Sequence, residues 1–361
     1  GRCFNAVPIA AFPQGRNPVK DFIPVARIAD MLLNPGAPFD YDGQTLTYPD
    51  NRLVYWAGGN PFHNHQDLTR LRKAVANIET FVVHEIGWTA TARHADIVLP
   101  ATMTLERNDI GGSRVDPLMI AMQQMAEPYG EARDDYAIFS ALSERMGCGE
   151  AFTEGRSVDQ WLRHLYQTTQ DALAARGLEA PDFDTFWKRG EMMLPQHPHD
   201  GGPLRAFRND PVGQPLPTPS GKVEIFSERI ASFGYDDCPG HPAWIAPVDV
   251  VNAQTPLQLV ANQPSSRLHS QFDFGTHSTE MKQRGREVMR INPQDAAPRG
   301  IKDGDIVKLS NARGACLAAA RLCDQLRPGV VQLPTGAWCR FRFETETRAL
   351  SVFNDLRETE V

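Results

Sequence analysis

The chain has 361 residues, a length that suggests two or more domains. Its net charge of −7 comes without any long basic run, which excludes an ordinary nucleic-acid-binding surface, and no stretch approaches the roughly 18 apolar residues of a membrane span. The six cysteines form no Cys-x-x-Cys pair, which argues against an iron–sulfur cluster, a structural zinc site or a disulfide scaffold in this chain.

The start of the chain does not resemble the start of a protein. It begins Gly1-Arg2-Cys3, without an initiator methionine and without the charged-then-apolar pattern of a signal sequence. Pro and Gly clusters then surround one short amphipathic run at 22–33. We therefore expect the chain to come from the middle of a larger protein, with any targeting segment out of view.

The chain is organised around residues 53–67. An apolar run at 53–57 predicts a buried strand, a glycine-rich turn follows, and helix-spaced apolar residues begin after Asp67. Such a turn offers free backbone N–H groups where an anion is favoured, and paired glycines let a ligand approach the backbone. An ordinary capped turn has the same composition, and both interpretations stay open. The candidate binding residues here are Gly58, Gly59, Asn60, His63, Asn64, His65 and Gln66.

Two further apolar runs, 80–84 and 97–101, predict a parallel sheet with right-handed crossovers. Ligands on such sheets bind at the carboxyl ends of the strands. Glu85 follows the first of these runs, and Asp109 closes the polar segment that follows the second. With the glycine turn, three polar segments are therefore expected to converge on one binding crevice.

The remaining chain changes character twice. Residues 191–250 read as an irregular connection, in which His197 and His199 are more typical of a solvated loop than of a metal site. From residue 251 onward, short strands alternate with Asp-Gly and Arg-Gly turns, which indicates a β-barrel. Within it, Asn292, Pro293 and Gly300 suit the cap, first residue and stop of a short helix.

Several long motifs resemble the molybdopterin oxidoreductases of the dimethyl sulfoxide reductase family, with the biotin sulfoxide, trimethylamine N-oxide and dimethyl sulfoxide reductases as the most similar branch. The first motif reads Trp-Ala-Gly-Gly-Asn-Pro-Phe-His-Asn-His-Gln-Asp at 56–67, and the resemblance extends from near residue 14 to about Trp338. The other motifs lie in the same order as in the family, at 88–101, 106–109, 262–271 and 291–305.

The resemblance implies an α/β plus β-barrel architecture, in which a parallel-sheet α/β domain precedes a C-terminal double-psi-type β-barrel. We expect a partial molybdopterin oxidoreductase domain at 1–190 whose N-terminal half is missing, an irregular connection at 191–250, and a dinucleotide-binding barrel at 251–338. Residues 339–361 do not continue the family pattern, and we expect a divergent tail there. A frame slip in the coding sequence is our hypothesis for this tail.

The resemblance also implies a bis(molybdopterin guanine dinucleotide) molybdenum cofactor that takes an oxygen atom from a small-molecule S- or N-oxide, with electrons from a donor protein or reductant. Glu85 and Asp109 are then candidates to accept from guanine N–H groups. Arg267 and His269 are the favoured pair for cofactor contact. Other cofactor-facing candidates are Asn262, Ser270 and Gln271. The protein ligand to molybdenum is expected in the absent N-terminal half, so we predict no catalytic residue and no activity for this chain alone.

Two other function classes stay open at this point. One is a standalone dinucleotide- or cofactor-binding protein without catalysis. The other is a metal-dependent hydrolase built on His63, His65, His84 and His94, although no His-Glu-x-x-His pattern supports it. His94 and Trp56 are expected to be structural. The resemblance implies the bacterial periplasm or the cytoplasm, since relatives occur in both, and we expect the leader that would decide between them to lie in the missing N-terminal part.

Overall fold

The computed structural model describes residues 11–113, 116–194, 204–247 and 249–338, with only the backbone of 342–343, 350–351 and 359–360 beyond them. The chain divides into two compact units. One holds the residues up to Asp21 together with Leu99–Ala231, and the other holds Phe22–Val98 together with the residues from Ser232 onward. In the part that the structure describes, no helix is both long and apolar enough to cross a bilayer.

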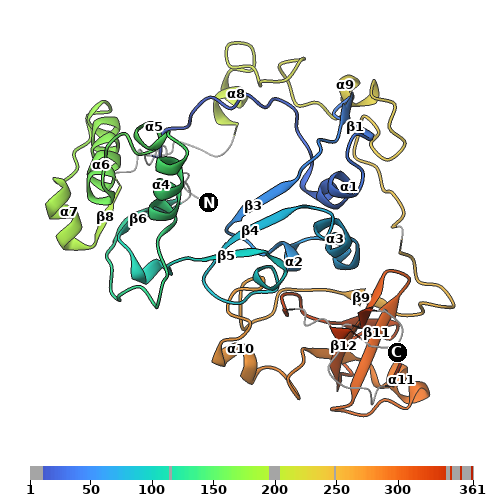
Figure 1. The fold of residues 1–361 in the computed structure, drawn as a ribbon. Helices are drawn as coiled ribbons and strands as arrows, with labels where there is room; N and C mark the ends of the chain where they lie inside the picture. Colours follow the sequence, from blue (N-terminus) through green and yellow to red (C-terminus); the bar gives the residue numbers. More distant parts are fainter. Residues whose placement is uncertain are drawn as a thin grey trace. The chain divides into compact units, whose positions relative to one another are not determined.

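A three-stranded sheet of order β3-β4-β5 forms one half of the second unit, to which all of its residues except Leu99 and Pro100 belong (Figure 1). Its strands are β3 (Leu53–Ala57), β4 (Thr80–Glu85) and β5 (Ile97–Pro100), and β3 pairs with β4 in parallel. The middle strand reads Thr-Phe-Val-Val-His-Glu and is buried on both faces, as expected for the centre of a parallel sheet. The three predicted strands are therefore confirmed.

The connection from β3 to β4 holds two helices rather than the single predicted helix. A one-turn helix, α2 (Pro61–Asn64), comes directly after the glycine turn. The amphipathic helix α3 (Leu68–Val75) begins only at Asp67, whose side chain accepts a hydrogen bond from the Arg70 N–H at 3.0 Å. The core beneath consists of Phe62, Phe81, Val83 and Ala90.

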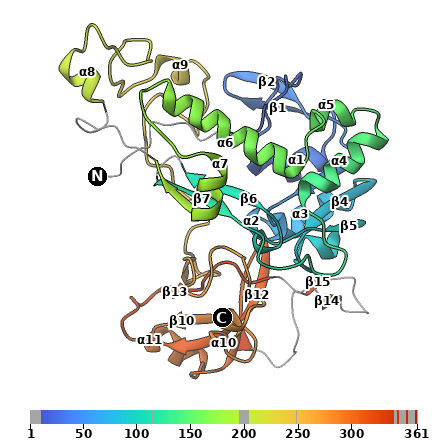
Figure 2. The same cartoon turned by 90° about the vertical axis from the view of Figure 1, so that its left-hand side faces the viewer.

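The other half of the second unit is a curled six-stranded mixed sheet. A sheet of this kind after an α/β domain agrees with the coarse prediction of an α/β plus β-barrel architecture. Its order is β16-β11-β12-β10-β13-β9. Figure 2 labels three of its strands, β10, β12 and β13. Asn292 caps α11 (Pro293–Ala296), and Gly300 ends the following turn at a φ of 67°, so the predicted short helix is confirmed. The strands are β9 (Gln258–Val260), β10 (Val288–Ile291), β11 (Ile306–Asn311), β12 (Gly314–Leu322), β13 (Val330–Gln332) and β16 (Thr359–Glu360).

Smaller elements complete the second unit. A hairpin pairs β1 with β2 in antiparallel fashion, and a two-residue pair joins β14 to β15. The bounds are α1 (Ile28–Leu33), β1 (Pro38–Tyr41), β2 (Gln44–Thr47), α10 (Thr276–Glu280), β14 (Arg342–Phe343) and β15 (Leu350–Ser351).

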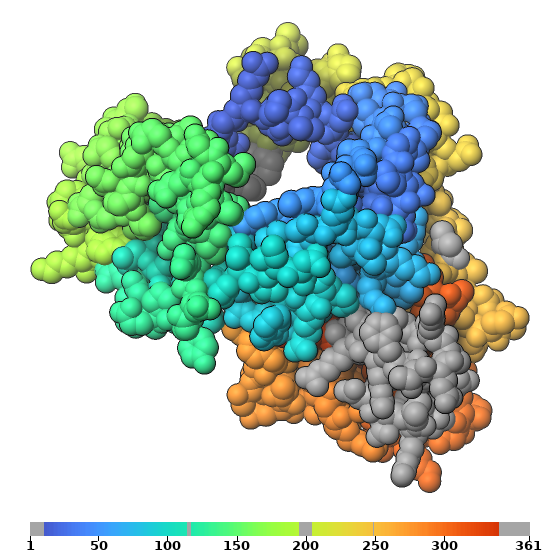
Figure 3. Space-filling model, in the orientation of Figure 1, coloured from blue at the N-terminus to red at the C-terminus, as the bar shows by residue number. Residues whose placement is uncertain are grey.

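The first unit packs helices against an antiparallel sheet of order β6-β7-β8. Tyr166 and Phe186 are fully buried in its core and stack at 4.6 Å between ring centroids. Ser157 and Gln160 form a capping box at the start of α6. Figure 3 shows α4 to α7 in green as one contiguous body. The elements are β6 (Asp109–Ser113), β7 (Asp116–Met122), α4 (Asp135–Arg145), α5 (Gly149–Thr153), α6 (Val158–Ala174), α7 (Phe183–Arg189), β8 (Glu191–Met193), α8 (Arg205–Asn209) and α9 (Glu228–Ala231).

The structure differs from the sequence prediction within 191–250. Glu191–Met193 is strand β8, which pairs with Leu118–Ile120 and buries Met192 in the core, so the first part of the predicted irregular connection belongs to the sheet. Three residues are too few to show an alternating pattern. His197 and His199 lie outside the described residues, as do the side chains of the predicted divergent tail at 339–361.

Candidate functional site

The glycine turn opens the site at the carboxyl end of β3. Gly58 and Gly59 are exposed and have φ values of 82° and 83°, in the left-handed region that residues with a Cβ rarely adopt. Nothing lies within 4 Å of a Cβ built on Gly58. The glycines are therefore required by the backbone conformation, and the turn is open to a ligand.

Asn60 ties this turn to two other segments through its buried side chain. Its Oδ1 accepts from the Thr91 hydroxyl at 2.5 Å, and that same hydroxyl oxygen accepts from the Phe62 N–H at 3.3 Å. The Asn60 amide donates to Ser270 Oγ at 3.3 Å. The two predicted site segments, 58–66 and 262–271, are therefore brought together within the second unit. Thr91 is the residue that the sequence analysis missed here.

The polar residues after the turn divide by exposure. His63 and His65 are half-buried, while Asn64 and Gln66 are exposed. Burial lowers the pKa of both histidines, and the charges of His269 and Arg267 lower the His63 pKa further. A lowered pKa favours neutral imidazoles near pH 7, each with one donor and one acceptor nitrogen.

Glu85 lies half-buried at the end of β4, close to the start of the next turn. Thr89 Oγ1 donates to its Oε1 at 3.0 Å, and the Ile86 N–H donates to its Oε2 at 3.1 Å. Burial raises the pKa of this carboxyl, and the hydrogen bond from Thr89 partly opposes that rise. Thr89 therefore fixes the orientation of a carboxylate that could accept further N–H donors.

Asp109 belongs to the other compact unit, where it begins β6. Its Oδ1 accepts from the Ile110 N–H at 2.8 Å, and its Oδ2 lies 3.5 Å from Arg107 Nε. Its predicted contact with guanine stays a prediction.

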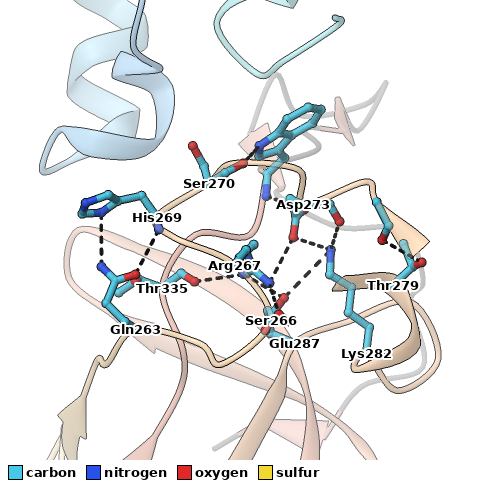
Figure 4. A network of polar contacts seen from close by, with 12 residues as sticks. Gln263, Ser266, Arg267, His269, Ser270, Asp273, Thr279, Lys282, Glu287 and Thr335 are labelled. Carbon is cyan, nitrogen blue, oxygen red and sulfur yellow. Dashed lines mark hydrogen bonds and ion pairs between the residues drawn. The ribbon is translucent and has the colours of Figure 1, made fainter. Parts of the chain in front are cut away.

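In the loop that follows β9, the side-chain amides of Asn262 and Gln263 form several hydrogen bonds. Asn262 accepts from Gln332 Nε2 at 2.8 Å and donates to the Gln263 carbonyl at 2.9 Å, so its side chain is engaged within the sheet. Gln263 holds His269 twice, through the His269 N–H at 3.1 Å and through Nδ1 at 3.2 Å (Figure 4). His269 and Gln271 are exposed, whereas Ser270 is buried.

A buried group of four charges lies at the base of this loop (Figure 4). The side chain of Arg267 is only 2% exposed. Its Nη2 lies 3.0 Å from Glu287 and donates to the Thr335 carbonyl at 2.9 Å, and its Nη1 lies 3.4 Å from Asp273. Lys282 Nζ lies 2.7 Å from Asp273 and 3.9 Å from Glu287. We call Arg267, Asp273, Lys282 and Glu287 the buried quartet.

The quartet changes how Arg267 is understood. Its two terminal nitrogens are engaged by protein oxygens, and its buried Nε has no hydrogen-bond partner among the residues that the structure describes. The guanidinium thus stabilises the loop from within, and its direct contact with a cofactor stays a prediction. The other three members were not predicted from the sequence, because each is an isolated Asp, Lys or Glu with no local pattern around it.

The other histidines of the alternative metal site have ordinary partners. His84 is buried with its Nε2 2.6 Å from the Tyr55 hydroxyl. His94 stacks on Phe62 at 4.0 Å between ring centroids, and its Nδ1 lies 2.7 Å from the Ala90 carbonyl, as its expected structural role implies. Across the described ranges, no three His, Cys, Asp or Glu side chains gather closely enough to hold a metal ion.

Two family models match the chain. The molybdopterin oxidoreductase model matches residues 30–145, and the molydopterin dinucleotide binding domain model matches residues 257–356, past Trp338. An acetylene hydratase from Pelobacter acetylenicus shares the fold with a TM-score of 0.59 at 23% identity, over 81% of this chain and 38% of that one.

Curated relatives are more similar in sequence. A biotin sulfoxide reductase from Cereibacter sphaeroides is 49% identical over 91% of this chain and 44% of the relative. A dimethyl sulfoxide/trimethylamine N-oxide reductase from the same organism is 45% identical over 92% and 41%. A trimethylamine-N-oxide reductase from Haemophilus influenzae is 42% identical over 91% and 42%.

The chain spans less than half the length of these curated relatives. Both family models nevertheless match it, in the order sheet domain and then curled sheet. The chain therefore contains regions of the molybdopterin oxidoreductase and molydopterin dinucleotide binding domain families, and it is similar to relatives at 42–49% identity across nine-tenths of its residues.

Proposed function

We propose that the protein containing this chain is a molybdenum-dependent reductase that removes an oxygen atom from a small-molecule sulfoxide or amine N-oxide. The observation that carries this proposal is the identity of 49% with a biotin sulfoxide reductase over 91% of the chain. We propose further that this chain supplies part of a bis(molybdopterin guanine dinucleotide) site, and that none of its cysteines ligates an iron–sulfur cluster. We propose, finally, that an electron-donor protein or another reductant supplies the electrons for this reaction.

The residues of the second unit fit a pterin dinucleotide. Gly58 and Gly59 are exposed and lie in the left-handed region, and successive N–H groups in such turns bind phosphate oxygens. Glu85 offers a carboxylate to guanine N–H groups. Further donors and acceptors come from two segments, namely His63 and His65 after the glycine turn, and His269 and Gln271 in the loop after β9. We assign no molybdenum ligand to this chain.

When bound, the molybdenum cofactor supplies the two-electron oxygen-atom transfer chemistry. The residues of this chain bind and orient it. Thr89 holds the carboxylate of Glu85 in one orientation, and the Thr91–Asn60–Ser270 hydrogen bonds keep the glycine turn beside the loop at 262–271. Hydrogen bonds that are fixed before binding reduce the entropy lost when the ligand is ordered.

We also propose that the curled C-terminal sheet closes as a double-psi-type β-barrel. In support, β10 pairs in parallel with β12 and antiparallel with β13, so the sheet is mixed, and its strands are short. The proposed domains are 1–190, 191–250 and 251–338, as expected from the sequence, except that β8 joins the first of them.

The proposal predicts different results for the chain and for the complete protein. Purified from a host that makes the cofactor, the chain should release a fluorescent pterin on denaturation but should not reduce biotin sulfoxide, dimethyl sulfoxide or trimethylamine N-oxide with reduced viologen. The complete protein should contain molybdenum and reduce at least one of them. Reduction of any of these oxides by the chain alone would contradict the proposal that this chain holds only part of the site. A complete protein that binds pterin but reduces none of these oxides would favour the standalone-binding alternative.

Glu85 should decide recognition of the guanine base. The Glu85→Gln variant is expected to bind guanosine monophosphate about tenfold more weakly or worse, because hydrogen bonds to a charged acceptor contribute about 1.5–3 kcal/mol. The ionised carboxylate is the binding form, so binding should be lost as pH falls through the Glu85 pKa. Because burial raises that pKa, the loss should begin at a higher pH than for an exposed glutamate. Calorimetric titration measures both effects.

A matched control is available in the same unit. Glu79 is an exposed glutamate paired with Arg52, and the Glu79→Gln variant should bind guanosine monophosphate like the wild type. Inosine monophosphate lacks the 2-amino group of guanosine monophosphate. Its affinity should therefore differ less between the wild type and Glu85→Gln. Equal loss of both nucleotides would assign Glu85 a role other than reading guanine.

A further inference from the structure

The loop above the buried quartet has a strained backbone. His269 and Phe272 have φ values of 51° and 52°, in the left-handed region that is unfavourable for residues other than glycine. Ser270 and Gln271 lie between them. Such conformations persist only where the surrounding structure fixes them. Segment 268–272 therefore needs an external restraint to present its side chains in one arrangement.

Contacts at both ends of this segment supply the restraint. Arg267 and Asp273 flank it and pair at 3.4 Å across its base. Trp338 donates its backbone N–H to Asp273 Oδ2 at 3.0 Å and its indole N–H to the Ser270 carbonyl at 2.8 Å. A Cβ on Gly336 would overlap the His269 carbonyl oxygen, so the chain passes directly beside the segment there.

Lys282 is the member of the quartet that lies outside both the segment and its immediate flanks. It follows α10, is 12% exposed, and contacts both carboxylates of the quartet. It also donates to the Asp273 carbonyl oxygen at 3.4 Å. With Lys282 the quartet is electrically neutral. Without it, two buried carboxylates share the single cation of Arg267, and Asp273 loses its shortest ion pair.

We infer that Lys282 is a positioning residue, which fixes segment 268–272 through Asp273 so that His269, Ser270 and Gln271 face the pterin dinucleotide in one arrangement. The inference rests on the proposed function for the identity of the ligand. The restraint itself rests only on the contacts of the quartet. Asn60, which donates to Ser270, brings the glycine turn against the same segment, so a shift of Ser270 disturbs both sides of the site.

The test compares three lysine variants in the full chain, purified from a host that makes the cofactor. Lys282→Met removes the charge, Lys282→Arg keeps it, and Lys302→Met removes an exposed lysine of the same unit. One readout is the rate of pterin loss during dialysis. The other is the ¹⁹F NMR signal of 5-fluorotryptophan at Trp338, assigned with Trp338→Phe. This NMR signal reports the position of segment 268–272 even when no cofactor is bound, because the indole N–H of Trp338 donates a hydrogen bond to the Ser270 carbonyl.

Lys282→Met is expected to lose pterin about tenfold faster and to shift the Trp338 signal, since small displacements of binding groups have large effects on ligand binding. Lys282→Arg should restore both readouts, and Lys302→Met should change neither. Lys282→Gln, which also removes the charge, is measured with the same two readouts. It tests the role of Lys282 if Lys282→Met does not fold.

The outcomes separate the inference from the proposed function. An unshifted Trp338 signal in folded Lys282→Met or Lys282→Gln overturns the inference, whatever the pterin result. A shifted signal with unchanged pterin loss also overturns it, because the segment would then not position the ligand. If the wild-type chain holds no pterin, the proposed function of the chain fails. The Trp338 signal and its restoration by arginine then still decide whether Lys282 fixes the segment.

Discussion

Replacing Arg267 by methionine is expected to destabilise the second unit by about 3–5 kcal/mol, because removal of one partner from a buried ion pair leaves an uncompensated buried charge. Glu287 would lose its 3.0 Å partner and, within the part of the chain that the structure describes, keep the ion pair with Lys282 at 3.9 Å. The Thr335 carbonyl would lose a donor as well. Methionine fills a similar volume, so the expected loss comes from charge and hydrogen bonding rather than from a cavity. Urea unfolding followed by tryptophan fluorescence measures the difference.

The control for this experiment is another arginine ion pair of the same unit. Arg313 pairs with Asp249, and both side chains are more than half exposed. Arg313→Met should therefore cost less than about 1 kcal/mol, as exposed ion pairs usually do. If Arg267→Met proves as mild as Arg313→Met, the quartet does not hold the loop as described.

Much of the fold was predictable because its signals are local. A few adjacent residues predict each of three elements, namely the strand at 53–57, the glycine turn and the strand at 80–84. The structure confirms all three. The same holds for Asn292 at the start of α11 and Gly300 after it. Capping and left-handed turns depend on one residue and its neighbours, so a single sequence is enough to find them.

The parts that were missed depend on partners distant in sequence. Thr91 is 31 residues from Asn60 along the chain, and Arg267 is 68 residues from Thr335. An isolated threonine or lysine carries no local sign that it will be buried beside such a partner. Strand β8 was missed for a related reason, since its three residues become a strand only by pairing with β7. Tertiary contacts decide these positions, and local patterns do not encode them.

The candidate site also shows why residue type alone does not assign a role. Arg267 and His269 seemed equivalent candidates from the sequence, yet the guanidinium of Arg267 is buried in ion pairs while His269 is exposed. The motif around them therefore combines groups that can face a ligand with groups that fix the loop. The proposed binding of a cofactor by this loop needs both kinds of residue in one short segment.

Phe62→Ala is expected to destabilise the second unit by about 3–5 kcal/mol, the usual cost of removing a buried aromatic ring from a well-packed core. Phe62 is fully buried, stacks on His94 at 4.0 Å, and follows directly on the glycine turn and Pro61. The cavity should also free the ring of His94 and loosen the turn, so pterin retention should fall with stability. Thermal unfolding and released pterin fluorescence measure the two effects.

Phe62→Leu and Phe22→Ala provide the comparison that makes this result interpretable. Leucine keeps most of the buried volume and should cost clearly less than alanine, because the penalty grows with the cavity that is left. Phe22 is 59% exposed, so its replacement by alanine should leave both unfolding and pterin retention close to the wild type. Equal effects of Phe62→Leu and Phe62→Ala would mean that stacking on His94, rather than packing volume, holds the turn in place.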